Sequence, residues 1–312
     1  MYKQSHLISY LYDKFYKEFD EYSNVTSSHW RVIGGGHHVV PKGEEWLLKG
    51  VGFGGFSEDI VINKIKYSYY NLLISSMKRK MRCNDKLWKL GKEVAKKQGR
   101  LFDFDCAKQV LAIDYLLKRL DVENFSSADI NRVCVIGDGY GYMTSLMYEF
   151  EPSLEVTCVN LGRSLIFDVY YSTLSSDCRV GVIDEGGVNN NNNNINFIPA
   201  ENYSIIQKIK QQDLFINIAS MQEMDLPIVN NYLRFMRDER HNSPLFYCCN
   251  RISKRLPDGG VICFDDYGWR ADDTIIFDEL CEWYQRYPKT VPFGWRDFDS
   301  PIRYKLVYLN SR

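Results

Sequence analysis

Three glycines at alternate positions, Gly137, Gly139 and Gly141, form the segment of this sequence best suited to bind a ligand. An apolar run, 132–136, precedes them, and apolar residues at helical spacing follow over 143–150. Glycine lets the backbone approach a ligand closely, and the first N–H groups of a helix have no partner within the helix. A strand, turn and helix of this kind predict a site for a nucleotide or another anion. The alternative is a tight turn that binds nothing.

The spacing of these glycines indicates which nucleotide. A dinucleotide fingerprint, Gly-x-Gly-x-x-Gly, would need glycine where Tyr142 stands, so a nicotinamide-dependent oxidoreductase is the weaker alternative. The Gly-x-Gly-x-Gly spacing resembles the first motif of class I methyltransferases that use S-adenosyl-L-methionine. The resemblance implies a Rossmann-like α/β fold with a mostly parallel sheet and an antiparallel last strand. It also implies that the donor contacts Gly137, Asp138, Gly139, Tyr140 and Gly141.

Two positions depart from that family pattern. Class I methyltransferases usually bind the ribose hydroxyls through an acid at the end of the second strand, where this chain has Asn160. Asparagine can bond to a hydroxyl, but without the assistance of a full charge. Val135 stands where the first motif often has an acid, and Asp138 is a partial substitute. These departures leave open a non-catalytic binding module of the same fold.

Three later segments point to an acceptor. The Ser220-Met221-Gln222-Glu223-Met224 run and the later Tyr-x-x-Asn-Arg over 247–251 resemble sugar O-methyltransferases of surface-polysaccharide gene clusters. The run Gly-Gly-Val-Ile-Cys-Phe-Asp-Asp-Tyr over 259–267 is similar to a loop of macrocin-type sugar O-methyltransferases. With the glycine motif, the resemblance covers about residues 130–310. It implies methylation of a sugar hydroxyl, on a surface glycan or a nucleotide sugar, in polysaccharide biosynthesis.

The chemistry of methyl transfer selects the candidate catalytic residues. A sulfonium methyl group is already activated, so the enzyme must align the acceptor hydroxyl and remove its proton. The macrocin-type resemblance implies that Asp265 and Asp266 act as the catalytic base or as Mg²⁺ ligands. Glu223 is the alternative carboxylate for this catalytic role. Ser220 and Met221 are further candidate contacts of the donor. The competing interpretations are a solvated turn for the aspartates, a helix-entry acid for Glu223, and another small metabolite as the oxygen or nitrogen acceptor.

The predicted secondary structure changes near residue 126, from mostly helices to strands that alternate with helices. Residues 1–125 are expected to form a mainly helical region for substrate contacts, a lid or oligomerisation, and 126–312 the donor-binding domain. The first region contains a glycine-rich span that includes His37 and His38, expected to be a loop. Helices are expected over 6–19, 57–82, 105–120 and 245–256, strands over 132–136, 155–160, 195–198, 214–219, 261–264 and 304–309, and a surface loop at the asparagine tract 189–194.

Composition narrows the class of protein. Thirty-nine basic residues against 40 acids give a net charge of −1, which argues against broad binding to nucleic acid. No apolar run approaches the ~20 residues of a membrane span, and the first residues do not resemble a signal peptide. The chain has nine cysteines, an odd number, and no Cys-x-x-Cys motif. This pattern is typical of cysteines that remain reduced and pack in the core. We therefore expect a cytoplasmic enzyme with a small-molecule or glycan substrate, and the sequence leaves homo-oligomer formation open.

Overall fold

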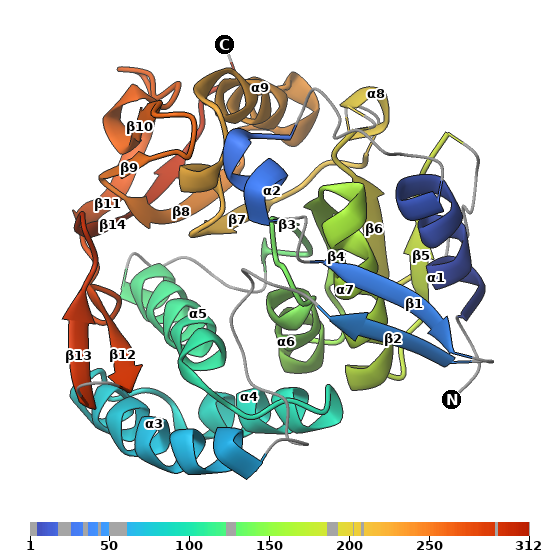
Figure 1. Cartoon of the computed structure of the whole chain (residues 1–312). Helices are drawn as coiled ribbons and strands as arrows, with labels where there is room; N and C mark the ends of the chain where they lie inside the picture. Colours follow the sequence, from blue (N-terminus) through green and yellow to red (C-terminus); the bar gives the residue numbers. More distant parts are fainter. Residues whose placement is uncertain are drawn as a thin grey trace.

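The alternating apolar and helical segments of the second half form an eight-stranded sheet in the order β11-β14-β8-β7-β3-β4-β6-β5 (Figure 1). The computed structural model describes residues 5–17, 26–33, 37–42, 45–49, 61–122, 129–185, 193–201, 203–206, 209–290 and 293–311. The strands of this sheet are β3 (Arg132–Ile136), β4 (Glu155–Asn160), β5 (Val180–Val182), β6 (Ile195–Pro199), β7 (Leu214–Ile218), β8 (Leu245–Arg251), β11 (Thr274–Leu280) and β14 (Ile302–Tyr308).

Strand direction matches the predicted fold. Six adjacent strands of the sheet, β8, β7, β3, β4, β6 and β5, run parallel to one another. Strand β14 runs antiparallel to both of its neighbours, β8 and β11. The Rossmann-like sheet with an antiparallel last strand is therefore confirmed. The chain moves from β3 towards β4 and β6, then returns to the other side of β3 to form β7. Open α/β sheets bind ligands at the carboxyl ends of their strands, where the strand order reverses in this way.

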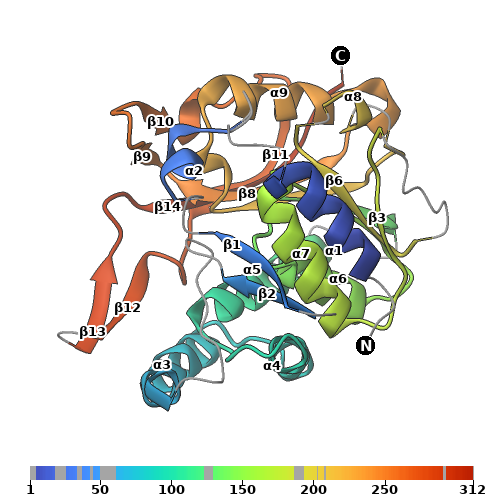
Figure 2. The same ribbon diagram turned by 45° about the vertical axis from the view of Figure 1, so that its right-hand side comes forward.

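Helices cover both faces of the sheet, and two hydrophobic clusters fill the space beneath them (Figures 1 and 2). Val133 and Val135 belong to the cluster under one set of helices, and Cys134 and Ile136 to the other, because side chains alternate along a strand. The first set contains α1 (Ser5–Tyr12), α4 (Asp85–Lys97), α5 (Phe104–Val122), α6 (Tyr142–Phe150) and α7 (Gly162–Ser175); the second contains α8 (Tyr203–Ile206) and α9 (Leu226–Met236).

The N-terminal third contains a hairpin as well as helices. Strands β1 (His38–Lys42) and β2 (Glu45–Lys49) pair antiparallel, so the expectation of a loop at His38 is wrong, whereas His37 precedes the strand. The remaining helices of this third are α2 (Ser28–Ile33) and α3 (Val61–Lys80), and a π-helical turn, Asp13–Lys17, extends α1. Parts of the predicted elements, namely 18–19, 34–36, 50–60 and 189–192, lie outside the described residues.

One predicted helix is a strand. Residues 245–251 form β8 in the middle of the sheet, and β9 (Ser253–Arg255) follows it, so the helix expected over 245–256 is wrong. A strand buried on both faces carries a continuous apolar run, and such a run has no period that distinguishes it from a buried helix. The strand expected over 261–264 exists as β10 (Val261–Cys263), but it pairs with β9 in a separate two-stranded sheet.

The hairpin of β12 (Arg286–Thr290) and β13 (Phe293–Asp297) projects from the sheet towards α3 (Figure 2). Trp295 of β13 packs edge-on against Phe104 at the start of α5, with ring centroids 5.8 Å apart. The hairpin thus connects the last strands of the sheet to the helices of the N-terminal third.

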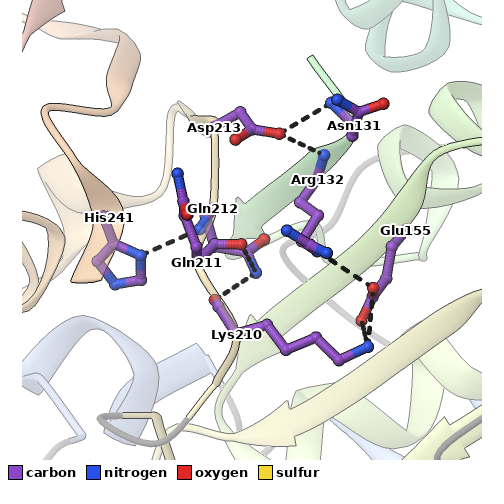
Figure 3. Close-up of polar contacts among 8 residues, drawn as sticks. All are labelled: Asn131, Arg132, Glu155, Lys210, Gln211, Gln212, Asp213 and His241. Atoms are coloured by element: carbon purple, nitrogen blue, oxygen red, sulfur yellow. Dashed lines mark hydrogen bonds and ion pairs between the residues drawn. The ribbon is translucent and has the colours of Figure 1, made fainter. Parts of the chain in front are cut away.

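Polar contacts hold the amino ends of the strands, on the side opposite the predicted ligand site (Figure 3). Asp213 accepts hydrogen bonds from the backbone N–H groups of Asn131 and Arg132, at 2.8 and 2.9 Å. His241 accepts the backbone N–H of Gln212 through Nδ1 at 3.0 Å. Burial lowers the pKa of His241 to about 4.

Two of the expectations from composition concern disulfide bonds and membrane-spanning helices. All nine cysteines are free in the structure. Among the helices that the structure describes, none combines the length and the apolar character needed to cross a bilayer.

Candidate functional site

Gly137 and Ser220 face one another where the strand order reverses. Gly137 follows β3 with a φ of 72°, and Ser220 follows β7. A β-carbon on Gly137 would overlap the Ser220 hydroxyl, and the positive φ separately disfavours any side chain. Glycine is therefore needed at position 137 because Ser220, another predicted donor contact, comes so close to it.

Asp168 of α7 holds the glycine turn to the end of β4. Its Oδ1 accepts the N–H of Gly141 at 2.8 Å, and its Oδ2 accepts Nδ2 of Asn160 at 2.8 Å. Burial and the nearby charge of Asp138 raise the pKa of Asp168 well above its usual value. Asn160 also accepts the N–H of Leu161 at 2.9 Å, so part of its bonding capacity is used within the protein. One N–H and one lone pair of the Asn160 amide remain for a ligand.

Asp138 caps the helix that follows the glycines. Its two carboxylate oxygens accept the N–H groups of Met143 and Thr144, at 3.1 and 2.7 Å. Burial raises the pKa of Asp138, while these bonds at the start of α6 act in the opposite direction. Asp138, the predicted substitute for an acid at position 135, thus binds backbone N–H groups of the protein itself.

Two cavities that share lining residues lie along this edge of the sheet. One of about 240 Å³ has mainly apolar walls that include Val159, Leu161, Ala200, Met224 and Ile228. The other, of about 300 Å³, is mainly polar and is lined by Trp30, Asp105, Lys108, Gly137, Asp138, Gly139, Asn160, Ile218, Ala219, Ser220, Gln222, Glu223, Arg251 and Tyr284. Both cavities share Trp30, Asn160 and Ser220, so they meet above the turns that follow β3, β4 and β7.

Buried amides fix the ends of β3, β7 and β8 relative to one another. Asn217 donates to the Ile136 carbonyl at 2.9 Å and accepts Nδ2 of Asn250 at 2.8 Å. Asn250 in turn accepts the N–H of Gln222 at 3.1 Å, and Gln222 accepts the N–H of Arg251 at 2.8 Å. Because these amides are almost fully buried and bonded to one another, they give the turn that carries Ser220 and Glu223 a defined position.

Backbone strain marks the same turn. Ala219 has a φ of 60°, a left-handed conformation that costs an alanine roughly 1–2 kcal/mol. Its N–H donates to the Cys249 carbonyl at 2.8 Å, and its neighbour Ser220 lines both cavities. Strain of this kind persists where surrounding structure enforces it, and it concentrates at functional sites.

Glu223 lies in the wall of the polar cavity and is bound by two cationic or protonatable side chains. Lys254 of β9 donates to Oε1 at 2.6 Å, and Nε2 of His29 lies 3.3 Å from Oε2. Burial raises the pKa of Glu223, but the bond from His29 and the charge of Lys254 outweigh it and lower the pKa. Ser27 also donates to the Glu223 carbonyl. Figure 1 shows α2, which carries His29, beside the ends of β3 and β7.

Further charged and polar groups of the polar cavity come from α5, from β8 and from the segment after β11. Lys108 donates to Asp105 at 2.7 Å and to the Tyr284 hydroxyl at 3.4 Å. Burial lowers the pKa of Lys108, yet the charge of Asp105 more than compensates and raises it. Arg251 pairs with the exposed Asp299 at 2.6 Å and packs over the ring of Phe298. The polar cavity therefore holds fixed charges of both signs.

The structure brings most of the predicted donor-binding residues together, with three exceptions. Gly137, Asp138, Gly139, Asn160 and Ser220 line the cavities. Tyr140 lies under the Arg100 guanidinium, 3.9 Å from its ring centroid, Gly141 is held by Asp168, and Met221 is fully buried in the hydrophobic cluster under α9. None of these three is among the cavity-lining residues.

Asp265 and Asp266 lie away from both cavities. They belong to the short turn η6 (Phe264–Asp266) after β10, and β10 is outside the central sheet, so their predicted place beyond a fifth sheet strand is wrong. Asp265 is 68% exposed and pairs with Arg303 at 2.7 Å, and Asp266 is exposed. No group of three or more His, Cys, Asp or Glu among the described residues could hold a metal. Neither aspartate is among the residues that line the two cavities.

Eight lining residues of the polar cavity were not predicted as site residues from the sequence, and four of these lie far from the glycine motif along the chain. Trp30, Asp105, Lys108 and Tyr284 come from α2, α5 and the segment after β11, far from the glycine motif in sequence. Asp105 and Lys108 have the i, i+3 spacing of a helical ion pair, which is a weak signal because most such pairs lie on solvated faces.

Comparisons with known proteins give only distant similarities to solved structures. No family model matches the chain, and no curated protein matches it. Solved structures that it resembles include the mitomycin 7-O-methyltransferase MmcR, at 11% identity and a TM-score of 0.37, over 72% of this chain and 60% of that one. TehB from Haemophilus influenzae matches at 11% identity and a TM-score of 0.41, over 61% of each chain. MtNAS in complex with S-adenosylmethionine matches at 13% identity and a TM-score of 0.35, over 81% and 80%.

Proposed function

We propose that this protein binds S-adenosyl-L-methionine across the turns after β3, β4 and β7 and transfers its methyl group to an oxygen of a small acceptor. The observation that carries the proposal is the pair of cavities that meet above the contact between Gly137 and Ser220. The apolar cavity suits an adenine ring, and the polar cavity suits the charged amino-acid end of the donor and the acceptor. Asn160, at the boundary, has bonding capacity left for a ribose hydroxyl.

The charges of the polar cavity fit the amino-acid end of this donor. Lys108 and Asp105 lie on the α5 side of the cavity that also contains Gly137 and Gly139. In this proposal Lys108 binds the donor carboxylate and Asp105 its ammonium group, each giving up part of their mutual contact. Charge-assisted bonds of this kind are about twice as strong as neutral ones, which supports recognition of a zwitterion.

A sugar hydroxyl is the acceptor that we propose. Its support is that two of the three sequence segments similar to sugar O-methyltransferases, 220–224 and 247–251, converge beside the polar cavity. Gln222 of the first segment bonds to Asn250 and Arg251 of the second. The acceptor would then lie near Glu223 and Arg251, which both line this cavity. A surface glycan and a nucleotide sugar are the two forms of acceptor that the motifs favour, and cytoplasmic polysaccharide biosynthesis is the corresponding proposed role.

Calorimetric titration with S-adenosylhomocysteine tests the donor assignment. We expect one site per chain, and we expect Lys108→Met to weaken binding at least tenfold while exposed Lys89→Met leaves it unchanged. NADH serves as the competing nucleotide. Heat from NADH, with none from S-adenosylhomocysteine, would contradict the donor assignment.

Transfer itself is measured with methyl-labelled donor and a panel of nucleotide sugars, free sugars and phenolic acceptors. Label in a nucleotide sugar or free sugar supports the sugar hydroxyl. Label only in phenolic acceptors would reject it while leaving methyl transfer intact. Binding of S-adenosylhomocysteine without transfer to any acceptor would favour the non-catalytic binding module.

A further inference from the structure

Arg251 lines the polar cavity from the carboxyl end of β8. Its backbone N–H donates to the Gln222 side chain at 2.8 Å, and its Cζ lies 4.7 Å from the ring centroid of Phe298. Phe298 in turn packs edge-on against Tyr284, another lining residue, with ring centroids 5.1 Å apart. A fixed backbone and an aromatic surface therefore hold this arginine in the wall of the cavity.

Most of the hydrogen-bonding capacity of the Arg251 guanidinium is unused within the described part of the chain. A guanidinium carries five N–H groups. Among the described residues only Asp299 accepts one of them, from Nη1 at 2.6 Å, and the buried Nε–H has no acceptor. Asp299 is 68% exposed, so water screens this pair, whereas the Arg251 side chain is 18% exposed. An oxygen ligand in the cavity would supply acceptors that these residues do not.

The carboxylates that line the same cavity each have a partner of their own. Asp105 accepts Lys108 at 2.7 Å, Glu223 accepts Lys254 at 2.6 Å, and Asp138 accepts N–H groups at the start of α6. Of the two cations among the lining residues, only the arginine has its carboxylate partner outside the cavity wall. The cavity therefore offers a ligand one positive charge that no lining carboxylate neutralises.

We propose that Arg251 binds an anionic group of the acceptor, a phosphate or a carboxylate, and so selects a charged sugar over a neutral one. The inference rests on the proposed methyltransferase function and narrows its acceptor. The planar fork of a guanidinium matches two oxygens of either group, and charge-assisted bonds are about twice as strong as neutral ones. Sugar phosphates, nucleotide sugars and sugar acids carry such a group, whereas a neutral glycan does not. In this role Arg251 determines which acceptor binds and does not handle the transferred methyl group.

Calorimetry on the protein saturated with S-adenosylhomocysteine tests the inference without methyl transfer. The probes are glucose 1-phosphate, glucuronate and glucose, which share a sugar ring and differ in charge. At least one of the two charged sugars is expected to bind about tenfold or more tightly than glucose, with an affinity that falls as the salt concentration rises. The charged sugar that binds distinguishes a phosphate from a carboxylate. Equal affinity for all three probes, or no binding of either charged sugar, would overturn the proposal.

Variants separate ligand recognition from structural support. Arg251→Met is expected to weaken binding of the preferred charged sugar about tenfold or more and to leave the Kd of S-adenosylhomocysteine within about threefold of wild type. Asp299→Asn keeps the guanidinium, so it is expected to bind that sugar at least as tightly as wild type. Arg286→Met, which removes an exposed pair with Asp297, is the matched control. Wild-type affinity in Arg251→Met, or an equal loss in Asp299→Asn, would overturn the proposal.

Kinetics with labelled donor distinguish this inference from the proposed function. Arg251→Met is expected to raise the KM of a charged sugar acceptor about tenfold or more, with kcat within about threefold of wild type. Transfer of label to neutral sugars alone would reject the charged acceptor and leave sugar methylation intact. Loss of S-adenosylhomocysteine binding in Arg251→Met would overturn the inference by assigning the arginine to the donor. Failure of the wild-type protein to bind S-adenosylhomocysteine would instead refute the proposed function.

Discussion

The Ser220 hydroxyl occupies the space that a β-carbon on Gly137 would need. These two residues follow β3 and β7, the neighbouring strands between which the strand order reverses. Their contact sets how closely the two turns approach and where the two cavities meet.

Gly137→Ala is therefore expected to weaken binding of S-adenosylhomocysteine at least tenfold, because Ser220 and the turn that carries it must move. Gly99→Ala is the control, since Gly99 has a similar φ of 67° but no atom near the position of its β-carbon. Both variants carry the cost of a left-handed alanine, roughly 1–2 kcal/mol. Calorimetry should separate them, and Ser220→Gly should partly restore binding in Gly137→Ala. Equal losses in the two alanine variants would contradict the steric explanation.

Asp168→Ala is expected to lower the free energy of unfolding by about 2–4 kcal/mol, because it leaves the buried Gly141 N–H and the half-buried Asn160 amide without their acceptor. Donor binding should weaken as well, since both groups belong to the turns around the cavities. Urea denaturation measures the first effect and calorimetry the second. Exposed Asp177→Ala is the control, and a loss below about 0.5 kcal/mol in Asp168→Ala would argue against this role.

Asp265→Asn and Asp266→Asn are expected to retain methyl transfer within about twofold of wild type. Both residues are exposed and lie outside the cavities, and Arg303 keeps a second partner in Asp278 when Asp265 is changed. A chelator should leave the rate unchanged for the same reason. A tenfold fall in kcat in either variant, reversed by added Mg²⁺, would restore these aspartates to the site.

Stability is expected to fall as the pH drops from about 6.5 to about 4, in part because of His241. Burial lowers its folded pKa to about 4, so in this window the unfolded chain binds more protons than the folded one, and protonation favours unfolding. The contribution is on the order of 2–3 kcal/mol. His241→Asn keeps an acceptor for the Gln212 N–H and removes the titration. Unfolding measured across this window should depend less on pH in the variant, and an identical slope would contradict the assignment.

Local features of the sequence predicted the framework of the site. The apolar run before Gly137, the glycine spacing and the β-branched segments over 155–160 and 195–198 each depend on neighbouring residues alone. They placed five of the eight predicted donor-binding residues along the cavities. The same local logic could not identify β8, because a strand buried on both faces and a buried helix are equally apolar.

The set of residues in the candidate site was decided by tertiary structure. Trp30, Lys108 and Glu223 line the polar cavity but are separated by about 80 and 115 residues in sequence, and no periodicity links them. They meet only because α2 and α5 pack against the carboxyl edge of a sheet whose strand order reverses beside β3. The error at Asp265 has the same origin: its predicted place required β10 to join the central sheet, and the position between β8 and β11 is filled by β14, paired there by backbone hydrogen bonds that no local sequence pattern specifies.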